Sequence, residues 1–185
     1  MKLKDKFNFD NPTYAPLRDS SRAVSKAYLD GNRFLDTTKE YVYIEQSLKY
    51  CSEIIHRQAH KFLKLLDDFG DMLHERHLMQ EYAETPELNW REELKDMDGV
   101  FEFIVRVLEN VHEALEEFHR QTDNAQFRPM ALYAEELMLT NSQDHTKFLE
   151  MWAIYDQLNE KGSMGSPTSF DSYCKKLLDE EGDKE

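Results

Sequence analysis

Histidine follows glutamate at a spacing of three residues in three places along this chain. On a helix, residues three apart lie on one face, so a carboxylate oxygen and an imidazole nitrogen can converge on one metal ion. In a chain with 37 acidic residues and 7 histidines such spacings also arise by chance, and a solvated helix face is the alternative interpretation. The three pairs are Glu53 and His56, Glu109 and His112, and Glu116 and His119.

A second group of acidic and imidazole side chains spans residues 68–77. Asp71 and Glu75 are one helical turn apart and share a face with Met72. Carboxylates among apolar residues must be paired, bound to a cation or exposed to water. A cation bound there is one interpretation, and neutralisation by Arg76, Lys64 or water is the other.

Polar residues interrupt the apolar stripe of the last long helix at residues 140–145. Asn141 and Asp144 are in phase with the core positions around Leu137 and Phe148. A carboxylate at Asp144 in the core would have to bind a metal, take up a proton, or pair with a histidine such as His112, a lysine or an arginine. The alternative is a loop at residues 140–143 that leaves Asp144 exposed.

Long helices are the elements that must position these residues. Apolar residues recur at helical spacing, and 6 glycines and 5 prolines leave little room for the turns of a sheet. We expect an extended arm over residues 1–16, a helical bundle over 17–158, a linker over 159–168, and an amphipathic helix with an acidic tail over 169–185. Within the bundle we expect helices over 17–29, from about 37 to 69, over 100–121, and from the turn at 122–124 to about 158. The sequence leaves open whether residues 37–82 form one helix or two, and a turn is expected at 30–32.

Composition excludes several classes of protein. A net charge of −14 repels a phosphate backbone, so we expect no direct nucleic-acid binding by the bundle. No apolar run is long enough for a signal peptide or a membrane span. The two cysteines, far apart in the sequence, are expected to be reduced thiols in the cytoplasm.

The segment from His56 to Arg76 resembles the second helix of the Dps mini-ferritins. It has a histidine, an aromatic residue at Phe62, and the sequence Asp-Met-Leu-His-Glu-Arg at 71–76, similar to the Asp-x-x-Ala-Glu-Arg signature of that family. The resemblance implies that His56, Asp71 and Glu75 bind metal, together with a histidine from the first helix of a partner subunit. No histidine precedes His56 in this chain.

The turn at 123–124 and the helix that follows resemble the fourth helix of the wider ferritin-like superfamily. A resemblance to ordinary ferritins would instead place Glu53, His56, Glu109 and Asp144 near ligand positions. Either resemblance implies an all-α, ferritin-like four-helix bundle that assembles into homo-oligomers. It also implies Fe(II) binding, with oxidation by dioxygen or peroxide and iron storage or protection against peroxide, so the chain would be a ferroxidase.

A second hypothesis needs no metal. An acidic helical bundle without catalytic activity could act as a protein interaction module, with its N-terminal arm or its C-terminal helix contacting a partner. The mass of the oligomer and the metal content of the purified protein distinguish the two hypotheses.

Overall fold

Helices account for the regular structure of the described chain, as the sequence predicts. The computed structural model describes residues 12–76, 78, 80, 81, 84, 94–124, 126–160 and 166–182, and these contain no β-strand. The elements are the 3-10 helix η2 (Pro12–Tyr14) and the α-helices α1 (Ala15–Ile44), α2 (Lys49–Glu75), α4 (Met97–Thr122), α5 (Arg128–Glu160) and α6 (Ser166–Gly182).

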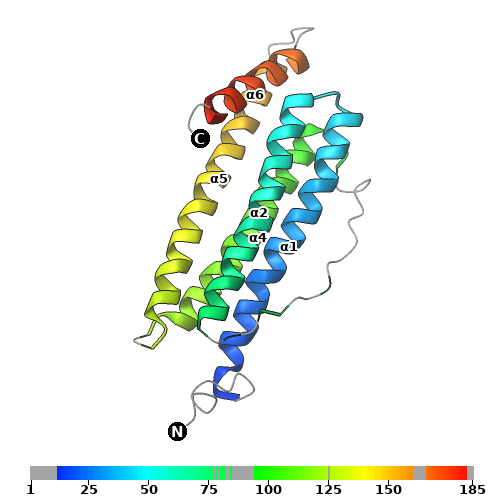
Figure 1. Ribbon diagram of the computed structural model, residues 1–185. Helices are drawn as coiled ribbons and strands as arrows, with labels where there is room; N and C mark the ends of the chain where they lie inside the picture. The colour runs from blue at the N-terminus through cyan, green and yellow to red at the C-terminus, as the bar shows by residue number, and fades with distance from the viewer. Residues whose placement is uncertain are drawn as a thin grey trace.

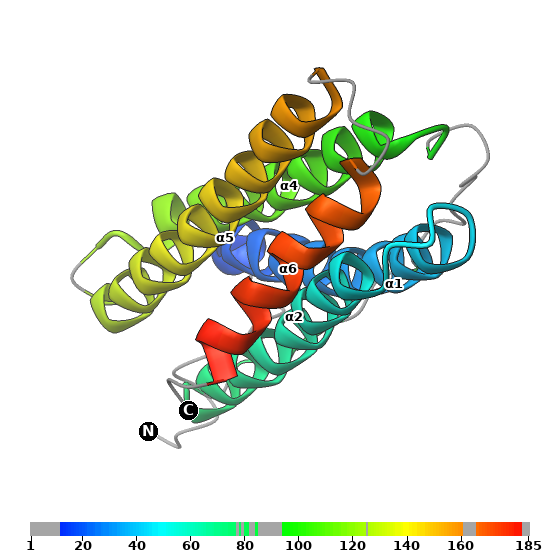
Figure 2. The same cartoon turned by 90° about the horizontal axis from the view of Figure 1, so that it is seen from above.

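The four long helices form two antiparallel pairs (Figure 1). α1 packs on α2, α4 packs on α5, and α1 also contacts α4. α2 ends at the opposite end of the bundle from the start of α4, so these two helices run in the same direction (Figure 1). α6 lies across one end of the bundle and contacts both α2 and α5, as Figure 2 shows from above.

The turn expected at residues 30–32 does not exist, because α1 continues through it to Ile44. Gly31 is buried against α2, and a β-carbon at this position would lie 2.7 Å from the Phe62 ring. The Asn32 side chain donates a hydrogen bond to the Ala59 carbonyl of α2 at 3.0 Å. Gly31 therefore allows α1 to approach α2 closely, and Asn32 joins the two helices by a hydrogen bond. The residue types alone are typical of a turn, which is why the sequence predicted one.

The first real break falls inside the helix expected from residue 37 to 69. α1 ends at Ile44, and Ser47 adopts a φ of 56° in the turn before α2 begins at Lys49. The Leu48 amide donates to the Val42 carbonyl at 3.2 Å, which closes this turn. Leu48 is buried, so the apolar periodicity runs on through the turn and conceals it.

α5 is continuous through residues 140–145, where a loop was the alternative. The hydroxyls of Thr140 and Ser142 donate to the carbonyls of Glu136 and Met138, one turn earlier. Such bonds let hydroxyl side chains remain in a helix without competing for its backbone. The continuous helix turns Asn141 towards the core.

Aromatic side chains fill the interior along its whole length. The rings of Tyr28 and Phe62 are 5.7 Å apart, and those of Phe69 and Phe118 are 5.1 Å apart. Edge-to-face and tilted pairs at these distances are favourable in addition to the apolar area they bury. No described helix combines the length and apolarity needed to span a membrane.

Candidate functional site

The carboxylate of Asp144 lies in the interior of the bundle, between α5 and α2. Its Oδ1 accepts from the Lys61 ammonium at 2.7 Å, and its Oδ2 accepts from the Gln58 amide at 3.0 Å. The Asp144 side chain is 11% exposed and that of Lys61 is 37% exposed. The expectation that Asp144 is buried and satisfied by a partner is confirmed, and the partner is a lysine.

A tyrosine hydroxyl is buried in the same region. Tyr28 is completely buried, and its hydroxyl makes no hydrogen bond. Burial raises the pKa of this phenol far above its usual value, and electrostatic repulsion by Tyr133, when that phenol is ionised, and by the Asp144 carboxylate raises it further. Tyr28 is therefore neutral, and its ring packs against that of Phe62 between α1 and α2.

This interior does not have the chemistry of a buried metal centre. Lys61 already neutralises Asp144, and a cation beside an ammonium group would be repelled. Across the described residues, no three side chains of the His, Cys, Asp and Glu types converge on a common point. A metal site built from described residues of a single chain is therefore not preformed.

His56 lies on the outer surface, on the side of α2 that faces α1. Its Nδ1 is 3.1 Å from the Lys39 ammonium and 3.5 Å from an Asp36 carboxylate oxygen. A hydrogen bond from Lys39 lowers the pKa of Asp36, with a smaller contribution from His56. The His60 ring stands edge-on to His56 at 4.4 Å. Glu53, the glutamate of the first predicted pair, bonds instead to Arg57 at 3.4 Å.

Asp71 and Glu75 are exposed near the C-terminal end of α2. Fifteen residues at about 1.5 Å each separate His56 from Asp71 by about 22 Å along one helix. One ion cannot bind both residues of the same chain, so the predicted set of His56, Asp71 and Glu75 does not assemble within a subunit. His77, which the sequence places in the same acidic group, lies outside the described residues.

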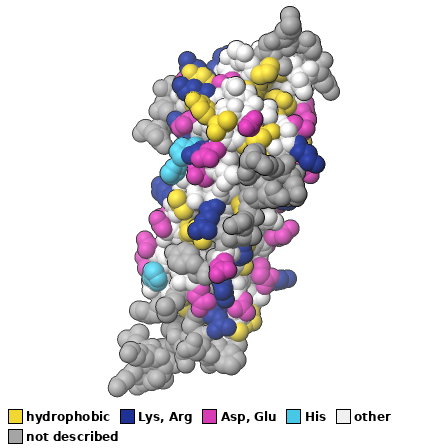
Figure 3. Space-filling view, turned by 90° about the vertical axis from the view of Figure 1, so that its right-hand side faces the viewer, with side chains coloured by type: hydrophobic (Ala, Val, Ile, Leu, Met, Phe, Trp, Pro, Cys, Tyr) yellow, Lys and Arg dark blue, Asp and Glu magenta, His cyan; other side chains and the backbone are white. Residues whose placement is uncertain are grey.

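The outer face of α2 carries histidines and acidic residues whose order along the helix is symmetric about the middle of that face. We call it the α2 stripe. At about 100° per residue its members lie within about 60° of His60. Figure 3 views the bundle from the side and shows histidines at two heights along one edge, each near acidic side chains. The α2 stripe consists of Glu53, His56, His60, Leu63, Lys64, Asp67, Asp71 and His74.

The second predicted pair, Glu109 and His112, lines a pocket between α4 and α5. The two side chains do not face one ion, because His112 Nε2 lies 3.4 Å from Glu116 and Glu109 lies 3.8 Å from His145 Nε2. His145 reaches this pocket from α5. The sequence did not predict a role for His145 in this pocket, because its partners are remote in the chain.

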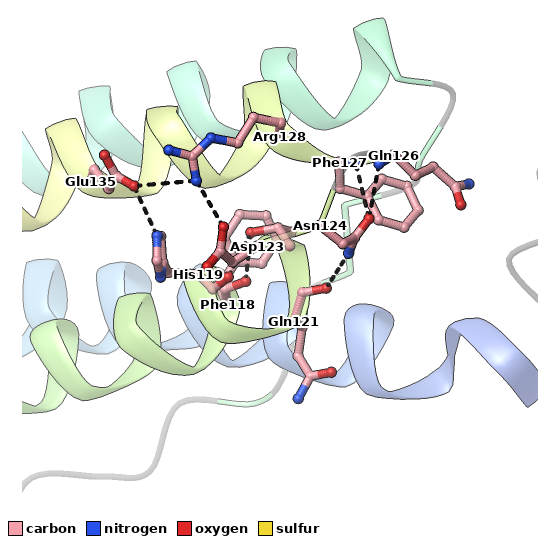
Figure 4. A network of polar contacts seen from close by, with 10 residues as sticks. Phe118, His119, Gln121, Asp123, Asn124, Gln126, Phe127, Arg128 and Glu135 are labelled. Atoms are coloured by element: carbon pink, nitrogen blue, oxygen red, sulfur yellow. Dashed lines mark hydrogen bonds and ion pairs between the residues drawn. The ribbon is translucent and has the colours of Figure 1, made fainter.

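The third pair separates as well, because His119 faces the neighbouring helix. Figure 4 shows His119 of α4 pointing at Glu135 of α5, with 3.0 Å between Nε2 and the carboxylate. Arg128 contacts Asp123 at 2.7 Å and Glu135 at 3.8 Å. The Asn124 carboxamide accepts from two backbone amides of the turn. This network closes the α4–α5 corner, so the role of His119 is structural.

Comparison with known proteins identifies similarity in structure but not in sequence. No protein-family model matches the chain, and no curated protein sequence matches it. A PmFTN variant soaked in iron for 45 min superposes with a TM-score of 0.77 at 11% identity, covering 85% of this chain and 97% of that one. The apo-ferritin of Pseudo-nitzschia multiseries gives a TM-score of 0.66 at 12% identity, covering 85% and 92%.

At these identities the similarity establishes the fold. Two antiparallel helix pairs, with a short helix across one end, are common to this chain and to those ferritin structures. The predicted fold class is therefore confirmed: this chain has the ferritin-like four-helix bundle fold with an additional C-terminal helix.

Proposed function

We propose that this protein is a homo-oligomer that binds Fe(II) between the α2 helices of two copies. The observation that supports this proposal is the symmetric order of the α2 stripe. When two copies pair antiparallel about the point between Leu63 and Lys64, His56 meets Asp71 and His60 meets Asp67, each twice. In the same register Glu53 meets His74. A twofold interface must be complementary to itself in this way.

This pairing gathers the metal ligands that one chain keeps apart. His56 and His60 are adjacent on one copy. Asp67 and Asp71 follow at one-turn spacing on the other copy. Imidazole and carboxylate groups together suit divalent iron. Leu63, which is 36% exposed, and Lys64 lie on either side of the axis, so the Leu63 side chain of each copy meets Lys64 of the other at the centre of the interface.

Contacts from α1 decide how well His56 can bind a metal. If the Nδ1–H group of His56 donates to Asp36, its Nε2 is free to coordinate, as in the carboxylate–histidine pairs behind many metal sites. Lys39 opposes this tautomer, because its ammonium can only donate to Nδ1. We therefore expect the variant Lys39→Met to bind metal more tightly than the natural protein.

The resemblance of residues 56–76 to the Dps second helix and the acidic net charge support the same function. The negative field would concentrate cations near the surface. Solved structures with this fold include a PmFTN variant soaked in iron. The proposal extends to oxidation of the bound Fe(II) by dioxygen or peroxide and to storage of the product.

Anaerobic Fe(II) titration, followed by calorimetry, tests the proposal directly. The natural protein should bind two Fe(II) ions per dimer, and Asp71→Asn and His60→Ala should each weaken binding at least tenfold, because each removes a ligand. Glu102→Gln is the matched control, because it removes an exposed carboxylate from α4 without touching α2. Equal binding by the control and by both α2 variants would overturn the proposed site.

A catalytically silent interaction module is the second candidate. The observation that favours it is the filled interior of the bundle. Lys61 neutralises Asp144 there, and aromatic rings fill the space. Protein purified without chelators should then contain no iron and run as a monomer. Iron in the purified protein, together with a dimer or a larger shell, would exclude this candidate.

A further inference from the structure

The pocket between α4 and α5 has a volume of about 560 Å³ and is separate from the α2 stripe. It lies between α4 and α5, the second helix pair. The side chains that line it come from one face of each helix. They are Leu108, Glu109, His112 and Glu113 of α4, and Asn141, Ser142, His145 and Thr146 of α5.

Two buried atoms of this pocket lack a hydrogen-bond partner. Asn141 is 4% exposed, and its amide nitrogen donates to the Leu108 carbonyl at 2.9 Å. That bond fixes the orientation of the carboxamide and leaves its Oδ1 buried and unpaired. The Nε2 atom of His145 is also buried and makes no hydrogen bond. A buried unpaired acceptor costs about 1–3 kcal/mol of desolvation, so a donor placed here would be bound favourably.

The hydroxyl and carboxylate groups of the pocket also accept rather than donate. The hydroxyls of Ser142 and Thr146 give their protons to the carbonyls of Met138 and Ser142, which leaves oxygen lone pairs as acceptors. Glu109 and Glu113 add two carboxylates at the mouth, and no lysine or arginine lines the pocket. The pocket therefore combines unpaired acceptors, negative charge and an apolar wall at Leu108.

We propose that this pocket binds a small organic ammonium ion, such as an alkyl diamine. One ammonium group would donate to Asn141 Oδ1 and, with the imidazole proton on Nδ1, to His145 Nε2, which lies 3.8 Å from the Glu109 carboxylate. The alkyl chain would lie along Leu108, and the second ammonium group would meet the carboxylates of Glu109 and Glu113. A metal ion fits less well, because no three ligand side chains of the described residues converge on one point. The acceptors are instead spread along the pocket, as an extended donor requires.

Titration with 1,4-diaminobutane, followed by NMR and calorimetry, tests this proposal. We expect saturable binding in the millimolar range or tighter, with the largest shifts at Asn141 and His145. Butane-1,4-diol has the same length without charge and should not bind. Glu109→Gln and Glu113→Gln should each weaken binding about three- to fivefold, as expected for one partly exposed carboxylate. Glu102→Gln, on the outer side of α4, should leave the affinity unchanged.

Asn141→Leu removes the unpaired acceptor and should abolish saturable binding, while circular dichroism checks that the bundle remains folded. If this variant unfolds, the two glutamate variants and the diol still decide the question. Equal weakening by Glu102→Gln would show attraction to the acidic surface in general and would overturn the proposal. A pocket that binds Zn²⁺ through His112 and His145 but not the diamine would also overturn it. The test is independent of the α2 stripe, because none of these variants lies on α2.

Discussion

Asp144 shows how a single interior charge is accommodated in this protein. Its carboxylate has two partners from α2, one of them the positively charged Lys61. A buried ion pair contributes little net stability, but the loss of one partner leaves an uncompensated charge and is costly. The role of Asp144 that follows from these contacts is to fix α5 against α2.

A pair of substitutions tests that role. Lys61→Met should lower the free energy of unfolding by about 1–3 kcal/mol, less than for a fully buried pair because the lysine side chain is 37% exposed. Lys61→Met combined with Asp144→Leu should recover most of the loss, since both charges are then gone. Urea denaturation followed by circular dichroism measures both values. A double variant as unstable as Lys61→Met alone would contradict this account.

At the scale of the helices, the closest approach of α1 and α2 depends on Gly31. On an exposed helix, replacing glycine with alanine adds about 1 kcal/mol of stability through helix propensity. Here the new β-carbon would lie 2.7 Å from the Phe62 ring, which is itself held in the core. The steric cost must therefore exceed the gain in propensity.

We expect Gly31→Ala to reduce the free energy of unfolding by about 1–3 kcal/mol, in the range of overpacked cores. Gly70→Ala is the control, because its β-carbon would meet the end of the Gln80 side chain, which can move at the cost of its hydrogen bond to the Leu66 carbonyl. Thermal unfolding of both variants gives the comparison. A midpoint for Gly31→Ala above that of the natural protein would show that α1 and α2 separate easily.

α6 contacts the N-terminal end of α2 through the carboxylate of Asp171 and the thiol of Cys174. The Asp171 carboxylate accepts from the amides of Tyr50 and Cys51 at 2.7 and 3.0 Å, as a capping residue does. Cys51 and Cys174 are both completely buried. Their hydrogen bond, together with burial, raises the pKa of the Cys51 thiol well above its usual value.

Asp171→Ala should therefore destabilise the protein by about 1 kcal/mol, the usual value of a lost cap. It should also speed the labelling of Cys51 by a thiol reagent, because α6 would open more often and expose the thiol to water, where its pKa is lower and more of the reactive thiolate forms. Glu180→Ala, on the exposed side of α6, is the control. Unchanged labelling in Asp171→Ala would show that apolar contacts alone hold α6 in place.

At the scale of the whole molecule, the proposed twofold pairing of the α2 stripe makes a prediction about register. His60 and Asp67 face each other twice in the antiparallel dimer, so His60→Asp should place four carboxylates at these two contacts and weaken the dimer about five- to tenfold. The exchange His60→Asp with Asp67→His restores both contacts in that register. Sedimentation equilibrium in metal-free buffer gives the dissociation constants, and failure of the exchange to restore affinity would exclude this register.

The sequence by itself determined the all-α class and the C-terminal parts of the bundle, and it predicted the burial of Asp144 as one of two alternatives. These features follow from local information: apolar residues at helical spacing in α4 and α5, and the phase of Asp144 within that pattern. The small number of glycines argued against a sheet from local information too, because a sheet needs frequent turns between its strands. Helical periodicity is a property of each segment, so it can be read without knowing what the segment contacts.

Only the tertiary structure decided where the first helix ends and which residues meet. Gly31 carries the local signal of a turn, but its place in a helix depends on Phe62 of α2. The true turn before Lys49 has no such signal, because Leu48 is as buried as a core helix residue. The pairing of Asp144 with Lys61 and of Glu109 with His145 likewise depends on the packing of one helix on another. Spacing in one segment carries no information about such contacts, which is why the three Glu-x-x-His pairs separated in the structure.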